Sequence, residues 1–162
     1  MNVISDTGPI IALAKTNNIK ILKLLFERVY ISRTVYKELM AKTGSEAEEI
    51  DKALKDFITV IEDNFSTMEI TPLLKELGEG EKHSIEFAYA NKDNIILLMD
   101  DKSGRNKARK LKLKTTGTIG VLITAKNKGL VENVTATLVL MRGKGYWFTD
   151  EIIEAAAKAA GE

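Results

Sequence analysis

The chain has 162 residues, of which 44% are hydrophobic and 29% charged, with a net charge of +1, one histidine and no cysteine. This composition excludes a disulfide framework, a thiolate zinc site and a thiol nucleophile. No apolar run approaches the roughly 20 residues that span a bilayer, and the N-terminus lacks the features of a signal peptide, so we expect one cytoplasmic domain with no membrane segment.

Apolar runs and helically spaced apolar residues alternate through the first part of the chain. In order, they predict a strand at Asn2–Ser5, a helix at Pro9–Lys15, a helical stripe from Ile19 to Phe26, a strand at Val29–Ile31, a helix capped by Ser32 and ending at Met40, a helix at Glu46–Lys55 and a strand at Phe57–Ile61. Pro9 suits a helix start, because its missing N–H needs no partner there.

The alternation continues to the C-terminus. We expect helices at Pro72–Leu77 and Glu81–Asn91, a strand at Ile95–Met99, a basic helix at Ser103–Leu111, a strand near Lys114–Thr116, and helices from Gly117 to Gly129, over Asn133–Arg142 and after Thr149. Short apolar strands separated by helices indicate a parallel sheet with both faces covered. The predicted fold class is α/β, a three-layer α/β/α sandwich with a central, mostly parallel sheet. We expect a single domain over 1–162, with 130–162 as a C-terminal helical extension.

Acidic residues follow two of the predicted strands. Asp6 follows the first strand, and Asp100 and Asp101 follow Ile95–Met99. A carboxylate at the end of a buried strand is costly to desolvate unless a proton, a cation or hydrogen bonds compensate it. Ligand sites of parallel sheets lie beyond the carboxyl ends of the strands, so these residues suggest a divalent metal site. Side chains alternate along a strand, so only one of Asp100 and Asp101 can easily point into the cleft.

Two glutamates on helices are further candidates. Glu81 shares a helical stripe with Ile85 and Ala88, and Glu38 borders the buried face of its helix. Each acid also has a simpler interpretation: Asp6 and Asp101 as helix N-caps, Glu81 as an ordinary first-turn acid, and Glu38 as a surface partner of Lys42.

The charge is unevenly distributed along the chain. Nine Lys and Arg residues and no acidic residue lie between Lys102 and Lys128, whereas most acidic residues lie between Glu38 and Asp101. Such a basic block is either a solvated helix face or a surface for an anionic polymer. Beside a carboxylate cluster, it favours a phosphodiester substrate.

The order and spacing of four segments resemble the PIN-domain family, specifically its prokaryotic branch that includes VapC-type toxin nucleases. The matching segments are Val3–Leu13, Val35–Leu39, Gly80–Ala88 and Leu97–Asp101. Many family members have Asp at the position of Glu81 and Thr or Ser at that of Met99.

The resemblance implies an endoribonuclease that uses Mg²⁺ or Mn²⁺ to activate water. By position, Asp6, Glu38, Glu81 and Asp101 are then the catalytic, metal-binding quartet, with Asp100 as a neighbouring candidate ligand. The RNA backbone would contact the basic stretch, namely Arg105, Lys107, Arg109, Lys110, Lys112 and Lys114. The resemblance also suggests a toxin with an antitoxin-like protein partner, and a homodimer. The alternative is a catalytically weak or silent module on the same fold that binds nucleic acid or protein.

Overall fold

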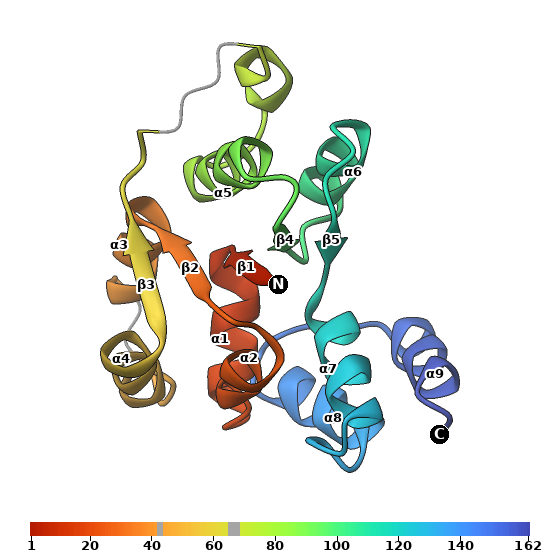
Figure 1. The fold of residues 1–162 in the computed structure, drawn as a ribbon. Coiled ribbons are helices and arrows are strands. Elements are labelled where there is room, and N and C mark those ends of the chain that lie inside the picture. The colour runs from red at the N-terminus through yellow and green to blue at the C-terminus, as the bar shows by residue number, and fades with distance from the viewer. Residues whose placement is uncertain (42–43, 65–68) are drawn as a thin grey trace.

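The centre of the fold is a parallel β-sheet, seen in a computed structural model that describes residues 1–41, 44–64 and 69–162. Within these residues, five strands lie in the order β3-β2-β1-β4-β5 (Figure 1). Their bounds are Asn2–Ser5 for β1, Val29–Ser32 for β2, Ile58–Ile61 for β3, Ile95–Leu98 for β4 and Thr115–Thr116 for β5. All the pairings between them are parallel, as the apolar strand pattern predicts.

The strand order reverses beside β1. The chain adds β2 and β3 on one side of β1, then crosses to add β4 and β5 on the other. Ser5 pairs with Leu98, so β1 and β4 end at the same level of the sheet. A reversal of this kind leaves a crevice outside the carboxyl ends of the two strands. The residues that follow β1 and β4 therefore emerge side by side at this crevice.

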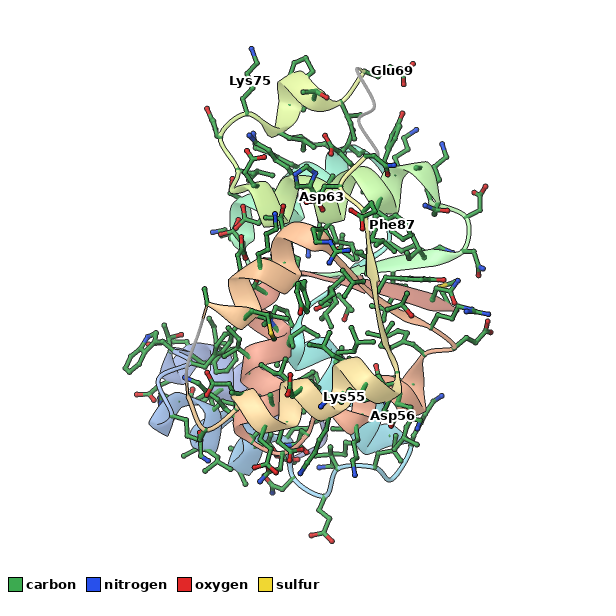
Figure 2. All side chains as sticks on the ribbon, turned by 90° about the vertical axis from the view of Figure 1, so that its left-hand side faces the viewer. Lys55, Asp56, Asp63, Glu69, Lys75 and Phe87 are labelled. Atoms are coloured by element: carbon green, nitrogen blue, oxygen red, sulfur yellow. The ribbon has the colours of Figure 1, made fainter. Side chains whose placement is uncertain are left out.

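Helices cover both faces of the sheet, which confirms the three-layer α/β/α sandwich. One face carries η1 and two helices, with bounds Thr71–Leu74 for η1, Glu79–Ala90 for α5 and Lys102–Lys110 for α6. The core on the other face includes α1 Thr7–Lys15, α2 Lys20–Leu25, α3 Arg33–Met40, α4 Ala47–Asp56, α7 Thr118–Asn127, α8 Val134–Gly143 and α9 Asp150–Ala159. Figure 2 shows this separation: α4, which carries Lys55 and Asp56, lies across the sheet from α5, which carries Phe87.

Alternating strand side chains divide the core into two clusters. Val3 and Leu98 face the cluster that contains α1 and the C-terminal helices, whereas Ile4, Leu97 and Met99 face the cluster beneath α5 and α6. Helices α8 and α9 thus share one core with the first helix of the chain. No helix in the described part of the chain is long and apolar enough to cross a membrane.

Most helix boundaries agree with the sequence prediction to within one or two residues, and the differences at α1, η1 and α5 have a physical reason or bear on the site. Helix α1 begins at Thr7, which moves Pro9 to its third residue; the first N–H groups of a helix have no internal partner, so proline fits there too. The predicted helix Pro72–Leu77 is a single 3₁₀ turn that ends at Leu74. Helix α5 begins at Glu79, after Gly78, so Glu81 is its third residue and not its first.

Candidate metal centre and its flanking groove

Asp6 is the most buried of the candidate acids. It follows β1 directly, is 9% exposed, and occupies the N-cap position of α1 without making a capping hydrogen bond. Burial raises the pKa of its carboxyl to about 7, and the charges of Glu81, Glu38 and Asp101 add to the rise, while the N–H of Thr7 partly opposes it. The capping interpretation of Asp6 is therefore wrong, and four carboxylates from four elements interact at the crevice.

Glu38 extends from α3 toward the start of α5. Its carboxylate accepts a short hydrogen bond from the Thr7 hydroxyl. A methyl group on Gly80 would lie 2.9 Å from a Glu38 carboxylate oxygen and 3.2 Å from Val35, so glycine at this position allows the close approach. The proposed surface partner Lys42 lies outside the described residues.

Glu81 and Asp101 each bind a backbone N–H near the start of a helix. Glu81 accepts from Gly78 N at 3.2 Å, and Asp101 accepts from Gly104 N at 2.6 Å as the N-cap of α6. Burial raises the pKa of Glu81, and the charges of Asp101 and Glu38 raise it further. Glu81 is thus a first-turn acid and Asp101 is a helix N-cap, as their simpler interpretations predict. The charges of both residues nevertheless raise the pKa of Asp6.

Asp100 points to a different set of partners from Asp101. Its carboxylate accepts from Thr118 N at 2.7 Å, from the Thr118 hydroxyl at 2.5 Å and from the Tyr146 hydroxyl at 2.5 Å. Burial and the Asp100 charge raise the pKa of Tyr146, so its phenol stays protonated and donates. Of the two neighbours, Asp101 is the one whose charge raises the pKa of Asp6.

The donor set of the cluster fits a hard divalent cation. It consists of carboxylate oxygens, the ligands that Mg²⁺ and Mn²⁺ prefer, and its mutual repulsion is what a cation would relieve. None of the ion pairs formed among the described residues involves Asp6, Glu38, Glu81 or Asp101. In this part of the chain, no three acidic or histidine side chains converge closely enough to hold one ion, so ligation requires side-chain rotation.

Only part of the basic stretch lies near the crevice. A groove of about 760 Å³ beside the cluster is lined by Arg105 and Arg109, together with Lys102. Lys107 instead faces η1, where it donates to Leu73 O at 2.7 Å and lies 3.7 Å from a Glu76 carboxylate oxygen.

The other three predicted RNA contacts lie at the end of α6 and in the segment between α6 and β5. Lys110 ends α6 and Lys112 lies in the turn after it. Lys114 precedes β5, and its carbonyl accepts from Leu97 N, which lies before the carboxyl end of β4. A role in RNA binding for these lysines stays a prediction.

Several residues at the crevice and the groove were not assigned a role from the sequence. Thr118 and Tyr146 donate hydrogen bonds to Asp100, and Tyr146, Trp147 and Lys102 line the groove. The available signal was the aromatic run Tyr146–Phe148, which contains the only tryptophan of the chain.

The family model described as "DUF3368: PIN domain" matches residues 2–162, which includes α8 and α9. No curated protein matches the chain, and neither does any solved structure.

Proposed function

This chain belongs to the PIN-domain family, whose fold is of the nuclease type, and we propose that it is a metal-dependent endoribonuclease. The proposed reaction is hydrolysis of RNA phosphodiester bonds with Mg²⁺ or Mn²⁺ at the acidic cluster. We further propose that it acts as the toxin of a toxin–antitoxin pair.

The observation that carries this proposal is the environment of Asp6. Its carboxyl is buried at the switch point of the sheet, and this burial, with a further contribution from three other carboxylates, raises its pKa to about 7. Residues with strongly perturbed pKa values in a crevice are candidates for functional sites. A group held in this way gains most from a bound cation, which would restore its charged form at neutral pH.

Asp6, Glu38, Glu81 and Asp101 would hold the metal, which when bound supplies an activated water and neutralises charge on the leaving oxygen. The protein contributes the orientation of these ligands. Thr7 fixes the Glu38 carboxylate through its hydroxyl, and the N–H of Gly104 fixes that of Asp101. Binding of a cation releases the Asp6 proton at pH values below about 7, so metal affinity should rise with pH up to that value.

The test is degradation of single-stranded and structured RNA by purified wild-type protein with millimolar Mn²⁺. We expect cleavage that EDTA stops and that Asp6→Asn abolishes. The matched control is Asp93→Asn, which makes the same chemical change at an exposed residue of the loop before β4. Cleavage that persists in Asp6→Asn would identify a contaminating ribonuclease, and absence of cleavage in wild type under all metals tested would refute the proposal.

A second candidate function is a catalytically silent module that binds nucleic acid or protein. One observation favours it: Glu38, Glu81 and Asp101 already accept hydrogen bonds within the protein. In that case RNA binds without being cut, and Mn²⁺ leaves the thermal stability of the protein unchanged.

The toxin role and the homodimer have separate tests. A toxin should arrest growth when it is expressed without its partner, and it should copurify with a small protein encoded by a neighbouring gene. Light scattering of the purified chain measures its oligomeric state directly.

A further inference from the structure

The groove beside the acidic cluster combines positive charge with exposed aromatic surface. One wall is a single face of α6, on which Lys102, Arg105 and Arg109 are spaced by one helical turn each. The opposite wall is the segment Gly145–Phe148 together with Ile152. Asp100 also lines the groove, whereas Asp6, Glu38, Glu81 and Asp101 are not among its lining residues, so the groove meets the crevice at Asp100.

Within the described part of the chain, the three cations on this face of α6, Lys102, Arg105 and Arg109, take part in no ion pair. Lys107, two residues from both Arg105 and Arg109 and therefore on the other side of α6, is instead bound to η1. The Nε of Arg105 is buried without a hydrogen-bond partner, and a methyl group on Gly117 would lie 3.0 Å from its Nη1. A buried, unsatisfied guanidinium N–H costs free energy that an anionic ligand would recover.

Trp147, on the opposite wall, is largely exposed to solvent. Its side chain is 74% exposed, although its neighbour Phe148 is buried. The rings of Tyr146 and Phe148 pack with centroids 5.4 Å apart, and the Arg142 guanidinium lies 5.9 Å from the Trp147 ring centre. The segment is therefore anchored on both sides of Trp147, while most of the indole faces solvent.

The groove opens onto the acidic cluster through Tyr146. The Tyr146 hydroxyl binds Asp100, and it would lie 2.9 Å from a methyl group on Gly8, in the first turn of α1. Asp6 and Asp101 are each close in the chain to one of these contacts. A polymer bound in the groove would therefore lead toward the carboxylates.

We propose that this groove binds single-stranded RNA, with one base stacked on Trp147 and the flanking phosphates bound by Arg105 and Arg109. A basic groove lined by an aromatic ring is the combination that binds single strands, because every base has a face to stack and every linkage carries a charge. Lys102, which follows Asp101 in the chain, adds a third cation to the groove. This inference rests on the proposed ribonuclease function and gives its substrate a defined path.

The test uses the fluorescence of Trp147, which is the only tryptophan in the chain. A labelled 12-residue oligouridylate is titrated into the Asp6→Asn protein, which should bind without cleaving, and both tryptophan emission and label anisotropy are recorded. We expect the two signals to change together. The slope of log affinity against log salt should be reduced by about 0.7 in Arg105→Gln and again in Arg109→Gln, one phosphate contact each.

Substitution of the ring separates stacking from folding. By anisotropy, Trp147→Ala should weaken binding about tenfold, whereas Trp147→Phe should retain most of it. The control Lys20→Gln removes an exposed charge on α2 and should leave affinity and salt slope unchanged. Circular dichroism of each variant shows whether it is folded.

Three outcomes would overturn the inference. The first is RNA binding that leaves Trp147 emission unchanged, and the second is no RNA binding at all. The third is emission that changes with protein concentration but not with RNA, which would assign the ring to a contact between copies of the chain or to a protein partner. The nuclease assay distinguishes the two proposals: cleavage without a change in emission refutes only the groove, and a change in emission without cleavage by wild type refutes only the nuclease.

Discussion

Replacing Asp6 with asparagine should stabilise the metal-free protein, and more so at high pH. The Asp6 carboxyl has a pKa of about 7 in the folded chain and an ordinary value of 3.8 in the unfolded chain. Because the folded state holds the proton more tightly, stability falls as pH rises from about 4 to 7 and then levels off. At 1.36 kcal/mol per pH unit, the raised pKa costs about 4 kcal/mol of stability at pH 8 and about 1.5 kcal/mol at pH 5.

The asparagine amide does not ionise, so the variant escapes this cost. Its free energy of unfolding relative to wild type should therefore increase by about 2.5 kcal/mol between pH 5 and pH 8, whatever the amide itself gains or loses by packing. Urea denaturation followed by circular dichroism measures this difference. Millimolar Mn²⁺ at pH 8 should stabilise wild type but not the variant, because only a ligand that binds the folded state shifts the equilibrium.

Asp93→Asn is the control for this measurement, since it changes an exposed carboxylate and should follow wild type at both pH values. The reasoning is refuted if Asp6→Asn differs from wild type by the same amount at pH 5 and pH 8. It is refuted equally if Asp93→Asn shows the same pH dependence, since the effect would then belong to net charge.

Three further substitutions test neighbouring contacts. Gly80→Ala should change the free energy of unfolding by less than about 1 kcal/mol, because the higher helix propensity of alanine offsets the crowding of its methyl group. The methyl group should nevertheless displace the Glu38 carboxylate and weaken Mn²⁺ binding, which calorimetry measures. Tyr146→Phe should cost about 1–2 kcal/mol in urea denaturation through loss of the hydrogen bond to Asp100. Hydrogen bonds from Lys126 and from the start of α8 lower the pKa of Glu162 to about 2. Glu162→Gln should therefore lower the thermal midpoint at pH 7. The difference from wild type should shrink as pH falls from about 4.5 toward 2. A Glu162→Gln difference that persisted at pH 2 would contradict this assignment.

The sheet and its bordering acids were predictable because their signals are local. Asn2–Ser5 is a strand as its apolar pattern predicts, and Ser32 caps α3 by accepting from Val35 N. The position of Asp6 after a buried strand is likewise a property of adjacent residues. Parallel strands with helical connections then bring the ends of β1 and β4 together by topology alone.

The partners of individual side chains were not predictable from local pattern. Whether Asp100 or Asp101 interacts with Asp6 depends on Thr118 and Tyr146, which bind Asp100 and lie 18 and 46 residues further along the chain. The basic helix α6 reads as uniformly charged in sequence, yet packing against η1 uses one of its lysines and leaves a different face over the groove. Such choices depend on tertiary contacts.

The central place of β1 in the sheet also has a consequence for folding kinetics. Val3 pairs with Val29 on one side, a short connection, but with Ile96 on the other, more than half the chain away. Closing so long a loop costs entropy before its contacts form, so the pairing of β1 with β4 should be a late and slow step. Asp6 and Asp101 meet only after that step. A nascent or partly folded chain therefore lacks the assembled acidic cluster, and the timing of β4 docking limits how soon after synthesis the protein could cut RNA.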